Sequence, residues 1–397
     1  MKPTKPTRIP LLLKIVIAIT LGIVCSLFFP PAITRIFVTI NGIFGNFLSF
    51  IIPLIILALI VPGIADLGKS AGGLLGMTVL IAYGSTVFAG FLSYFTCQWT
   101  YPSLLTPGAM DPEAVTQAGT QILPYFSIAM PPVMDVMSAL ILAFVLGLGL
   151  AAIKGEVLRN GMNEFKDITL LVIEKIIIPF LPLYIFGIFL KIGAEGQIGP
   201  VLGTFMKVIV VIFILHITLL LIQFTIAGIV AKKNPIKALI TMLPAYATAL
   251  GTQSSAATIP VTLKQAIKNG VREDVAGFVI PLCATIHLSG SILKITACAY
   301  AISLLNGMPT DLGTYAGFIL MLGVTMVAAP GVPGGAIMAA LAVLSSFLGF
   351  DENLQGIMIA LYIAMDSFGT ACNVTGDGAI ALVMNRINQK NTARDNA

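Results

Sequence analysis

The chain has 397 residues, of which 57% are hydrophobic and 10% are charged, and its mean hydropathy is +1.00. A soluble globular protein carries about 25% charged residues, so this composition excludes a water-soluble enzyme, a DNA-binding protein and a secreted disulfide scaffold. The net charge of +5 is small for this length, and the basic residues gather in short loops, so no nucleic acid is expected as a partner. The composition predicts an all-α polytopic protein embedded in a lipid bilayer.

Eight apolar segments are interpreted as membrane-spanning helices, because a span requires about 20 predominantly apolar residues. The first follows a basic stretch but has no cleavage pattern, so it is predicted to remain in the protein as a helix. In chain order the segments are 11–29, 43–61, 74–96, 137–153, 168–190, 201–230, 275–305 and 354–384.

Two further stretches, 235–270 and 312–350, are apolar but are interrupted by residues that a lipid-facing helix does not tolerate. The first is broken by a small polar run at 251–258, and the second by a Pro-Gly-rich run at 328–335. Non-helical backbone at membrane depth survives only where it is buried in protein or lines a polar cavity. Both stretches are therefore predicted to be re-entrant helical hairpins, and such paired broken segments point to the binding site of a transporter.

The basic residues are distributed unequally between the two predicted sides of the membrane. The predicted outer pieces hold little more than Arg35 and Lys191, whereas the predicted inner pieces hold most of the other lysines and arginines. The positive-inside rule then places both termini in the cytoplasm, with hairpin 235–270 entering from the inside and hairpin 312–350 from the outside. The short termini and compact loops favour a bacterial inner membrane.

The last predicted helix carries two aspartates that need partners inside the membrane. Asp366, Thr370, Asn373 and Asp377 recur at i, i+4, i+7 and i+11, which puts them within about 60° of one another on one helix face. An aspartate at mid-span requires a cation or a network of donors. The stripe is therefore interpreted as a site for a cationic group and a metal ion, and the alternative is a polar face against a loop or water.

A second polar face lies on the seventh predicted helix. His287, Ser291 and Lys294 recur there at i, i+4 and i+7. Ser289 and Gly290 are predicted to mark a local unwinding, whose exposed carbonyls are able to coordinate an ion. A lone histidine in a helix is more often a satisfied core residue than a ligand, so both interpretations of His287 remain open.

Three motifs resemble signatures of the dicarboxylate/amino acid:cation symporter family, the glutamate-transporter-like proteins. They are the serine-rich run 252–260, the Gly-Val-Pro-Gly sequence at 331–334 and the Asn-Val-Thr-Gly-Asp sequence at 373–377. The resemblance covers essentially the whole chain. It implies a homotrimer in which each protomer carries substrate and ions across the membrane by an elevator motion of one domain against a fixed scaffold.

The resemblance also implies a division of the chain into scaffold and transport domain. The scaffold would hold the first two helices, in 1–73, and the outer loop with the fourth and fifth helices, in 98–200. The transport domain would comprise the third helix, in 74–97, and all of 201–397. That last part contains the sixth, seventh and eighth helices with the hairpins at about 235–270 and 312–350.

The resemblance implies roles for individual positions. Asp366 would bind the substrate's amino group, and the hydroxyls and free N–H groups of the hairpin tips would bind its carboxylate. The implied substrate positions are Ser254, Ser255, Ser291, Val332, Gly334, Asp366, Gly369, Thr370 and Asn373. The implied ion positions are Cys283, Asn373 and Asp377 for one sodium ion, Thr285, Val327 and Ala329 for a second, and His287 in place of a family asparagine. No cofactor other than the coupling ion is expected.

The chain departs from the family where acidic substrates are recognised. Gly369 stands where members that carry glutamate or aspartate have an arginine, so a small neutral amino acid resembling serine, alanine or threonine is predicted. Lys294 stands in place of a tyrosine, where it would either pair with Asp366 or supply the missing positive charge. The second possibility keeps acidic amino acids and dicarboxylates as alternative substrates.

The coupling ion is the other point of departure. The family sequence Asn-Met-Asp-Gly-Thr is replaced here by His-Leu-Ser-Gly-Ser at 287–291, which removes an acidic sodium ligand and predicts a lower sodium stoichiometry. Neutral imidazole is a poor ligand for sodium. Proton coupling through His287 and Lys294, or exchange without coupling, is therefore the alternative to sodium coupling.

Two aspartates within one predicted span also allow a membrane-embedded protease as a different class. Asp366 and Asp377 are separated along the helix by roughly 16 Å, which is too far for two carboxylates to share one proton. No channel filter motif is visible in the sequence either. A carrier is predicted, and no enzymatic activity is expected.

Overall fold

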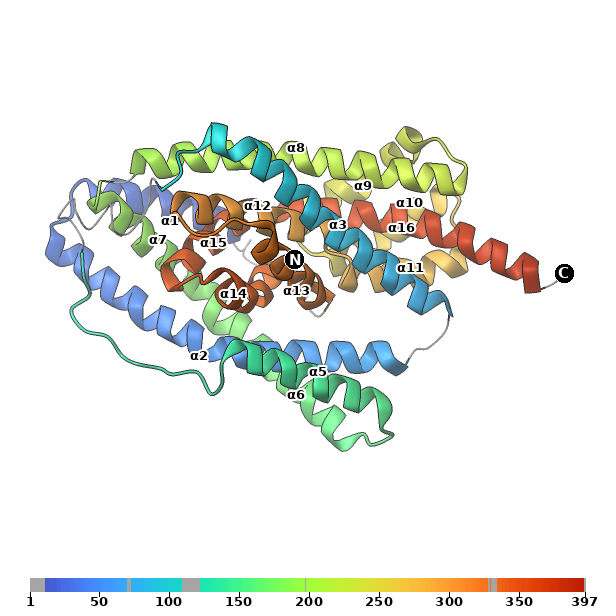
Figure 1. Cartoon of the computed structure of the whole chain (residues 1–397), viewed down its shortest axis with the longest axis horizontal. Helices are drawn as coiled ribbons and strands as arrows, with labels where there is room; N and C mark the ends of the chain where they lie inside the picture. The colour runs from blue at the N-terminus through green and yellow to red at the C-terminus, as the bar shows by residue number, and fades with distance from the viewer. Residues whose placement is uncertain are drawn as a thin grey trace, which may run out of the picture.

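Figure 1 shows a computed structural model of the chain, which describes residues 11–69, 73–108, 122–196, 198–327, 329 and 334–395. Throughout these ranges the regular structure is helical, as the composition predicted. The first half contains α1 (Leu11–Ser26), α2 (Pro31–Lys69), α3 (Gly73–Leu104), α5 (Val136–Ala152), α6 (Val157–Val172), a π-helical turn η1 (Ile173–Ile177), α7 (Ile178–Ala194) and α8 (Ile198–Ala231). The second half contains α9 (Pro235–Thr252), α10 (Ser255–Lys268), α11 (Glu273–Ile286), α12 (Ser289–Leu305), α13 (Leu312–Val327), α14 (Gly335–Leu348), α15 (Glu352–Ala364) and α16 (Asp366–Asp395).

Two of the predicted spans are each a pair of helices. The segment 275–305 consists of α11 and α12, which are separated at His287 and Leu288. The unwinding was predicted at Ser289 and Gly290, but the break lies immediately before them, and they are the first residues of α12. The segment 354–384 consists of α15 and α16, which are bent by 62° at Met365, so the prediction of one continuous last helix was wrong.

Fewer helices are long and apolar enough to cross a membrane than the sequence predicted. Among the described residues, five helical segments pass this test, and α15 with α16 gives a sixth if the bent pair forms one span. The predicted first and fourth spans correspond to α1 and α5, which are shorter apolar helices. The count of eight spans therefore stays a prediction.

Each stretch predicted to be a hairpin contains two short helices that pack against each other, and their re-entrant placement in the membrane stays a prediction. In the first hairpin, α9 and α10 are joined by two residues, Gln253 and Ser254. Gln253 adopts left-handed backbone angles, with φ of 53°, which reverses the chain direction at the tip. In the second hairpin, α13 packs on α14, and both halves are helical up to Val327 and from Gly335.

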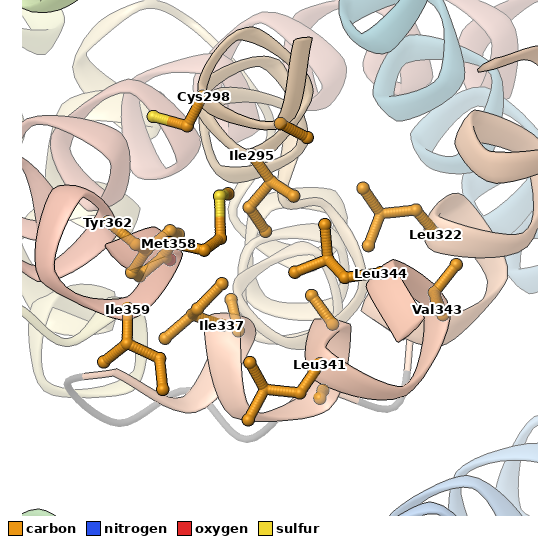
Figure 2. Packing of buried hydrophobic residues seen from close by; sticks show 14 of the residues in the cluster. Ile295, Cys298, Leu322, Ile337, Leu341, Val343, Leu344, Met358, Ile359 and Tyr362 are labelled. Atoms are coloured by element: carbon orange, nitrogen blue, oxygen red, sulfur yellow. The ribbon is translucent and has the colours of Figure 1, made fainter. Parts of the chain in front are cut away.

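The helices form two groups around the hairpins. The last helix, α16, packs against α8, α9, α10, α11 and α12, while α2 packs against α5, α6 and α7, and α1 packs against α7. In Figure 1, α8 runs along the top of the molecule, and α2 lies towards the opposite side with α5 and α6 below it. Figure 2 shows the apolar core between α12, α13, α14 and α15, where Ile295, Leu322, Ile337, Leu344 and Met358 are buried. In a bilayer such contacts stabilise the fold through close packing rather than through removal of water.

Candidate functional site

The tips of both hairpins reach the first turn of α16. The backbone N–H of Gly334, at the start of α14, donates to Asp366 Oδ2 at 2.8 Å. From the other hairpin, Gln253 Nε2 donates to Ser367 Oγ at 2.8 Å. Asp366 and Ser367 are buried at the bend between α15 and α16. The break in the last helix is therefore the point where segments that are more than 100 residues apart in sequence meet.

Lys294 forms an ion pair with Asp366 in the interior of the protein. Its Nζ lies 3.5 Å from Asp366 Oδ1, and its side chain is fully buried. The ammonium also donates to the Tyr362 carbonyl at 3.3 Å and lies 3.4 Å from the centroid of the Tyr362 ring. A Cβ atom at Gly369 would lie 2.9 Å from Nζ. The pairing of Lys294 with Asp366 is thus the first of the two roles that the sequence allowed.

Asn373 holds the start of α12 against the middle of α16. Its Oδ1 accepts hydrogen bonds from the N–H groups of Gly290 at 2.8 Å and Ser291 at 3.3 Å, which caps a helix start that has free donors. Its Nδ2 donates to Ser291 Oγ at 3.0 Å, and Tyr362 OH donates to the same oxygen at 3.2 Å. Gly290 permits this approach, because a Cβ there would lie 2.6 Å from Cys372 Cβ.

His287 contacts Asp377, the residue at which the sequence predicted a sodium ion. Nδ1 lies 2.9 Å from Asp377 Oδ1, and the two side chains are 0% and 1% exposed. On the other side of the ring, Nε2 lies 3.1 Å from Ser85 Oγ. Gln223 Nε2 donates to Ser85 Oγ at 3.0 Å and to Ser289 Oγ at 3.1 Å. The histidine is therefore the centre of a polar network that links α3, α8, α12 and α16.

The positions predicted for a second sodium ion lie at two helix ends. Thr285 is in the last turn of α11, Val327 is the last residue of α13, and Ala329 follows shortly after it. Because α11 and α13 are in contact and the last carbonyls of a helix lack intrahelical partners, this place offers backbone oxygens suited to sodium. Among the described residues, no three His, Cys, Asp or Glu side chains form a metal-binding group.

The remaining predicted substrate and ion positions lie in the first hairpin, on α11 and α16, and outside the described residues. Val332 lies outside the described residues. Ser254 caps α10 by accepting from the Ala257 N–H at 3.3 Å, and Ser255 is the buried first residue of that helix. Thr370 is buried on α16. Cys283 is also engaged, since its carbonyl accepts the His287 N–H at 2.8 Å.

Sequence reasoning missed three residues that the structure brings into the site. Tyr362 precedes Asp366 by four positions, but the bend between them hides the relation from helical periodicity. Ser367 has no distinguishing pattern in the sequence. Gln223 could have been found, because it is a single amide within the otherwise apolar helix α8, and a polar side chain inside a span is a functional candidate by default.

Replacing His287 with alanine is expected to destabilise the protein by about 3–5 kcal/mol, because breaking a buried pair leaves the partner charge uncompensated. Asp377 Oδ2 already has no hydrogen-bond partner among the described residues, so the carboxylate would lose its ring contact with no replacement. Thermal unfolding in detergent measures the effect. A second variant that also carries Asp377→Asn is expected to recover part of the loss, and equal loss in both would contradict the pairing.

Comparisons with known proteins identify the family of the chain. A model of the sodium:dicarboxylate symporter family matches residues 11–387. The serine/threonine transporter SstT of Acinetobacter baumannii strain AYE is 26% identical over 384 residues, which cover 94% of this chain and 95% of that protein. Excitatory amino acid transporter 3 of Mus musculus is 30% identical over 266 residues, which cover 64% of this chain.

The two relatives differ in how much of their own length is matched. The aligned region spans 49% of the mouse protein, about half of its length, and nearly the whole bacterial protein. The family match, by contrast, runs from the first described helix to within ten residues of the C-terminus. With apolar helices, two hairpins and a buried polar site at a broken helix, the chain belongs to the sodium:dicarboxylate symporter family.

Proposed function

We propose that the protein is a secondary active carrier of a small neutral amino acid such as serine, alanine or threonine, with sodium as the coupling ion. The observation that carries the proposal is the meeting of both hairpin tips at the start of α16, through Gly334 with Asp366 and Gln253 with Ser367. A site between two opposed hairpins is one that either hairpin can open to one side of the membrane.

The chemistry of the site suits an amino acid. The N-terminal ends of α10, α12, α14 and α16 gather around it, and the positive ends of helix dipoles favour a carboxylate. Asp366 supplies a negative charge for an amino group at the same place. An amino acid carries both groups a short distance apart, so one molecule engages the helix ends and Asp366 together.

The charges around Gly369 favour a substrate with a neutral side chain. The glycine supplies no cation, and Lys294, the basic residue beside it, is already paired with Asp366. A buried acidic side chain without its own positive partner is strongly disfavoured. The bacterial relative that aligns over nearly its whole length is named a serine/threonine transporter, which supports the same substrate class.

Sodium coupling is proposed from the family and from the ends of α11 and α13. Asp377 contacts His287, and Asn373 Oδ1 accepts two backbone hydrogen bonds, so these side chains are engaged within the protein. The backbone carbonyls near Thr285, Val327 and Ala329 offer sodium a set of ligands that are all oxygen atoms. We therefore place the coupling sodium ion at the two helix ends and expect a stoichiometry of one.

We further propose the elevator division of the family for this chain. The group around α16, together with α3 and both hairpins, would form the mobile transport domain, and α1, α2 and α5–α7 would form the scaffold. The packing of α2 on α5–α7 and of α16 on α8–α12 supports this division. Three protomers would assemble through their scaffolds in a bacterial inner membrane, with both termini in the cytoplasm.

Uptake by purified protein in liposomes tests the proposal. Labelled serine, alanine, threonine and aspartate are offered separately under an imposed sodium gradient, a proton gradient or neither. We expect sodium-driven accumulation of one or more neutral amino acids and little accumulation of aspartate. Accumulation driven by protons alone would move the coupling to His287, and accumulation of aspartate alone would overturn the neutral substrate.

A further inference from the structure

The carboxylate of Asp366 has partners within the protein itself. Asp366 receives an ammonium from Lys294 on one oxygen and the Gly334 N–H on the other. In the function proposed above, the ammonium would come from the substrate's amino group and the N–H would meet the substrate's carboxylate. We propose that Lys294 is a built-in substitute for the amino group, which neutralises Asp366 in the empty carrier and yields to the substrate. This inference rests on the proposed function.

The electrostatic reason is the cost of moving an unpaired charge through a membrane. Asp366 is 4% exposed, and a buried carboxylate without a partner is expensive both in a protein interior and in a bilayer. A carrier must return empty after it releases its substrate during net transport. With Lys294 in contact, the returning site holds one positive and one negative charge, and its net charge is zero.

One of these contacts also joins the second hairpin to the last helix. The Gly334 N–H belongs to the first residues of α14, and its acceptor Asp366 belongs to the first turn of α16. The hydrogen bond of 2.8 Å therefore holds the hairpin tip against the last helix.

Lys294 keeps other partners when a substrate's amino group takes its place at Asp366. Its distance of 3.5 Å to Asp366 is longer than the roughly 2.7–2.9 Å of a strong charge-assisted hydrogen bond, so the pair is loose. The Tyr362 ring and carbonyl both lie within 3.4 Å of the ammonium, and an aromatic face with a carbonyl stabilises a desolvated cation. Gly369 leaves the space that the ammonium occupies.

Two transport modes distinguish this role of Lys294 in the return step from a role in substrate binding. In exchange, labelled amino acid leaves liposomes that face unlabelled amino acid, and the carrier crosses the membrane loaded in both directions. In net efflux, the outer solution contains no amino acid, and the carrier must return empty. Lys294→Gln and Lys294→Met both remove the charge, the first with a polar group and the second with an apolar chain of similar length.

Both variants are expected to lose net efflux by at least about tenfold, because Asp366 returns unpaired. Exchange is expected to remain within about threefold of the wild type, and the half-saturation concentration is expected to fall by about threefold or more as the internal competitor disappears. Lys175→Gln is the matched control, since Lys175 forms an exposed pair with Glu174 and should leave both modes unchanged.

Three other outcomes would contradict the role of Lys294, and a fourth would contradict the proposed function. Net efflux at the wild-type rate in either variant would overturn the role of Lys294 alone. Loss of both modes in variants that elute as folded protein would also overturn it, because Lys294 would then be needed for binding. In the wild type, net efflux should be unchanged when choline replaces all potassium, and dependence on potassium would contradict a built-in cation. A wild type that carries no amino acid in either mode would overturn the proposed function itself.

Discussion

Substituting Asp366 with alanine is expected to abolish amino-acid binding while the protein still folds. Three contacts converge on this carboxylate: the Lys294 ammonium, the Gly334 N–H and, in the proposed function, the substrate's amino group. Loss of one partner of a buried charge pair costs about 3–5 kcal/mol, which corresponds to a decrease in affinity of more than about 100-fold. Binding of labelled serine to the purified protein measures the effect, and size-exclusion chromatography reports on folding.

Asp366→Asn refines the test, because asparagine keeps an acceptor for the Gly334 N–H but carries no charge. We expect it to hold the second hairpin in place and still to bind no amino acid. The matched control is Asp351→Asn, at the cap of α15, where Oδ1 accepts the Leu354 N–H at 2.8 Å and asparagine is an equally good cap. Saturable uptake by Asp366→Ala at wild-type affinity would mean that the amino group binds elsewhere.

The polar stripe and the two hairpins were predictable because they depend on local patterns. Residues at i, i+4, i+7 and i+11 share a helix face wherever that helix lies, so Asp366 and Asp377 were correctly assigned to one face of α16. Proline and glycine within apolar segments likewise mark breaks at membrane depth. Such signals identify elements, and they locate the groups that need partners without identifying the partners.

The bend at Met365 had no such signal. The sequence from Glu352 to Asp366 contains no proline, and its apolar residues run unbroken from Ile357 up to the bend at Met365. The cause is tertiary: Asp366 begins a new helix where it meets the tip of the second hairpin, and that tip is more than 30 residues upstream. A break that depends on a contact distant in sequence cannot be inferred from helix propensity, which is a weak local preference.

The pairing of His287 with Asp377 was unpredictable for the same reason. The sequence showed a histidine in place of an asparagine and an aspartate 90 positions later, which allowed either a sodium site or a core histidine. The choice depends on how α16 packs against the end of α11, which brings Asp377 Oδ1 within 2.9 Å of His287 Nδ1. It also depends on the positions of Ser85 and Gln223 on the other side of the ring. In the structure His287 and Asp377 contact each other, and their roles as sodium ligands stay predictions.

Gly369→Arg is expected to abolish transport when it is introduced alone. The first side-chain carbon at this position would lie 2.9 Å from the Lys294 ammonium, and the guanidinium would bring a second cation into a buried site that holds one carboxylate. Overpacking and like-charge repulsion both oppose this arrangement. Serine uptake in liposomes should fall to background, and normal uptake would show that Lys294 is free to move out of the way.

Combining Gly369→Arg with Lys294→Ala is expected to create a carrier of acidic amino acids. The lysine's space then becomes available to the arginine, whose planar guanidinium binds a side-chain carboxylate through two hydrogen bonds. We expect the ratio of aspartate uptake to serine uptake to rise by at least about 100-fold, since the acidic side chain gains the partner that it lacked. The matched control is Gly369→Met with Lys294→Ala, which adds similar bulk without charge and should not favour aspartate. If the double variant Gly369→Arg with Lys294→Ala gains no aspartate uptake while it still carries serine, the side chain of the substrate does not point towards Gly369.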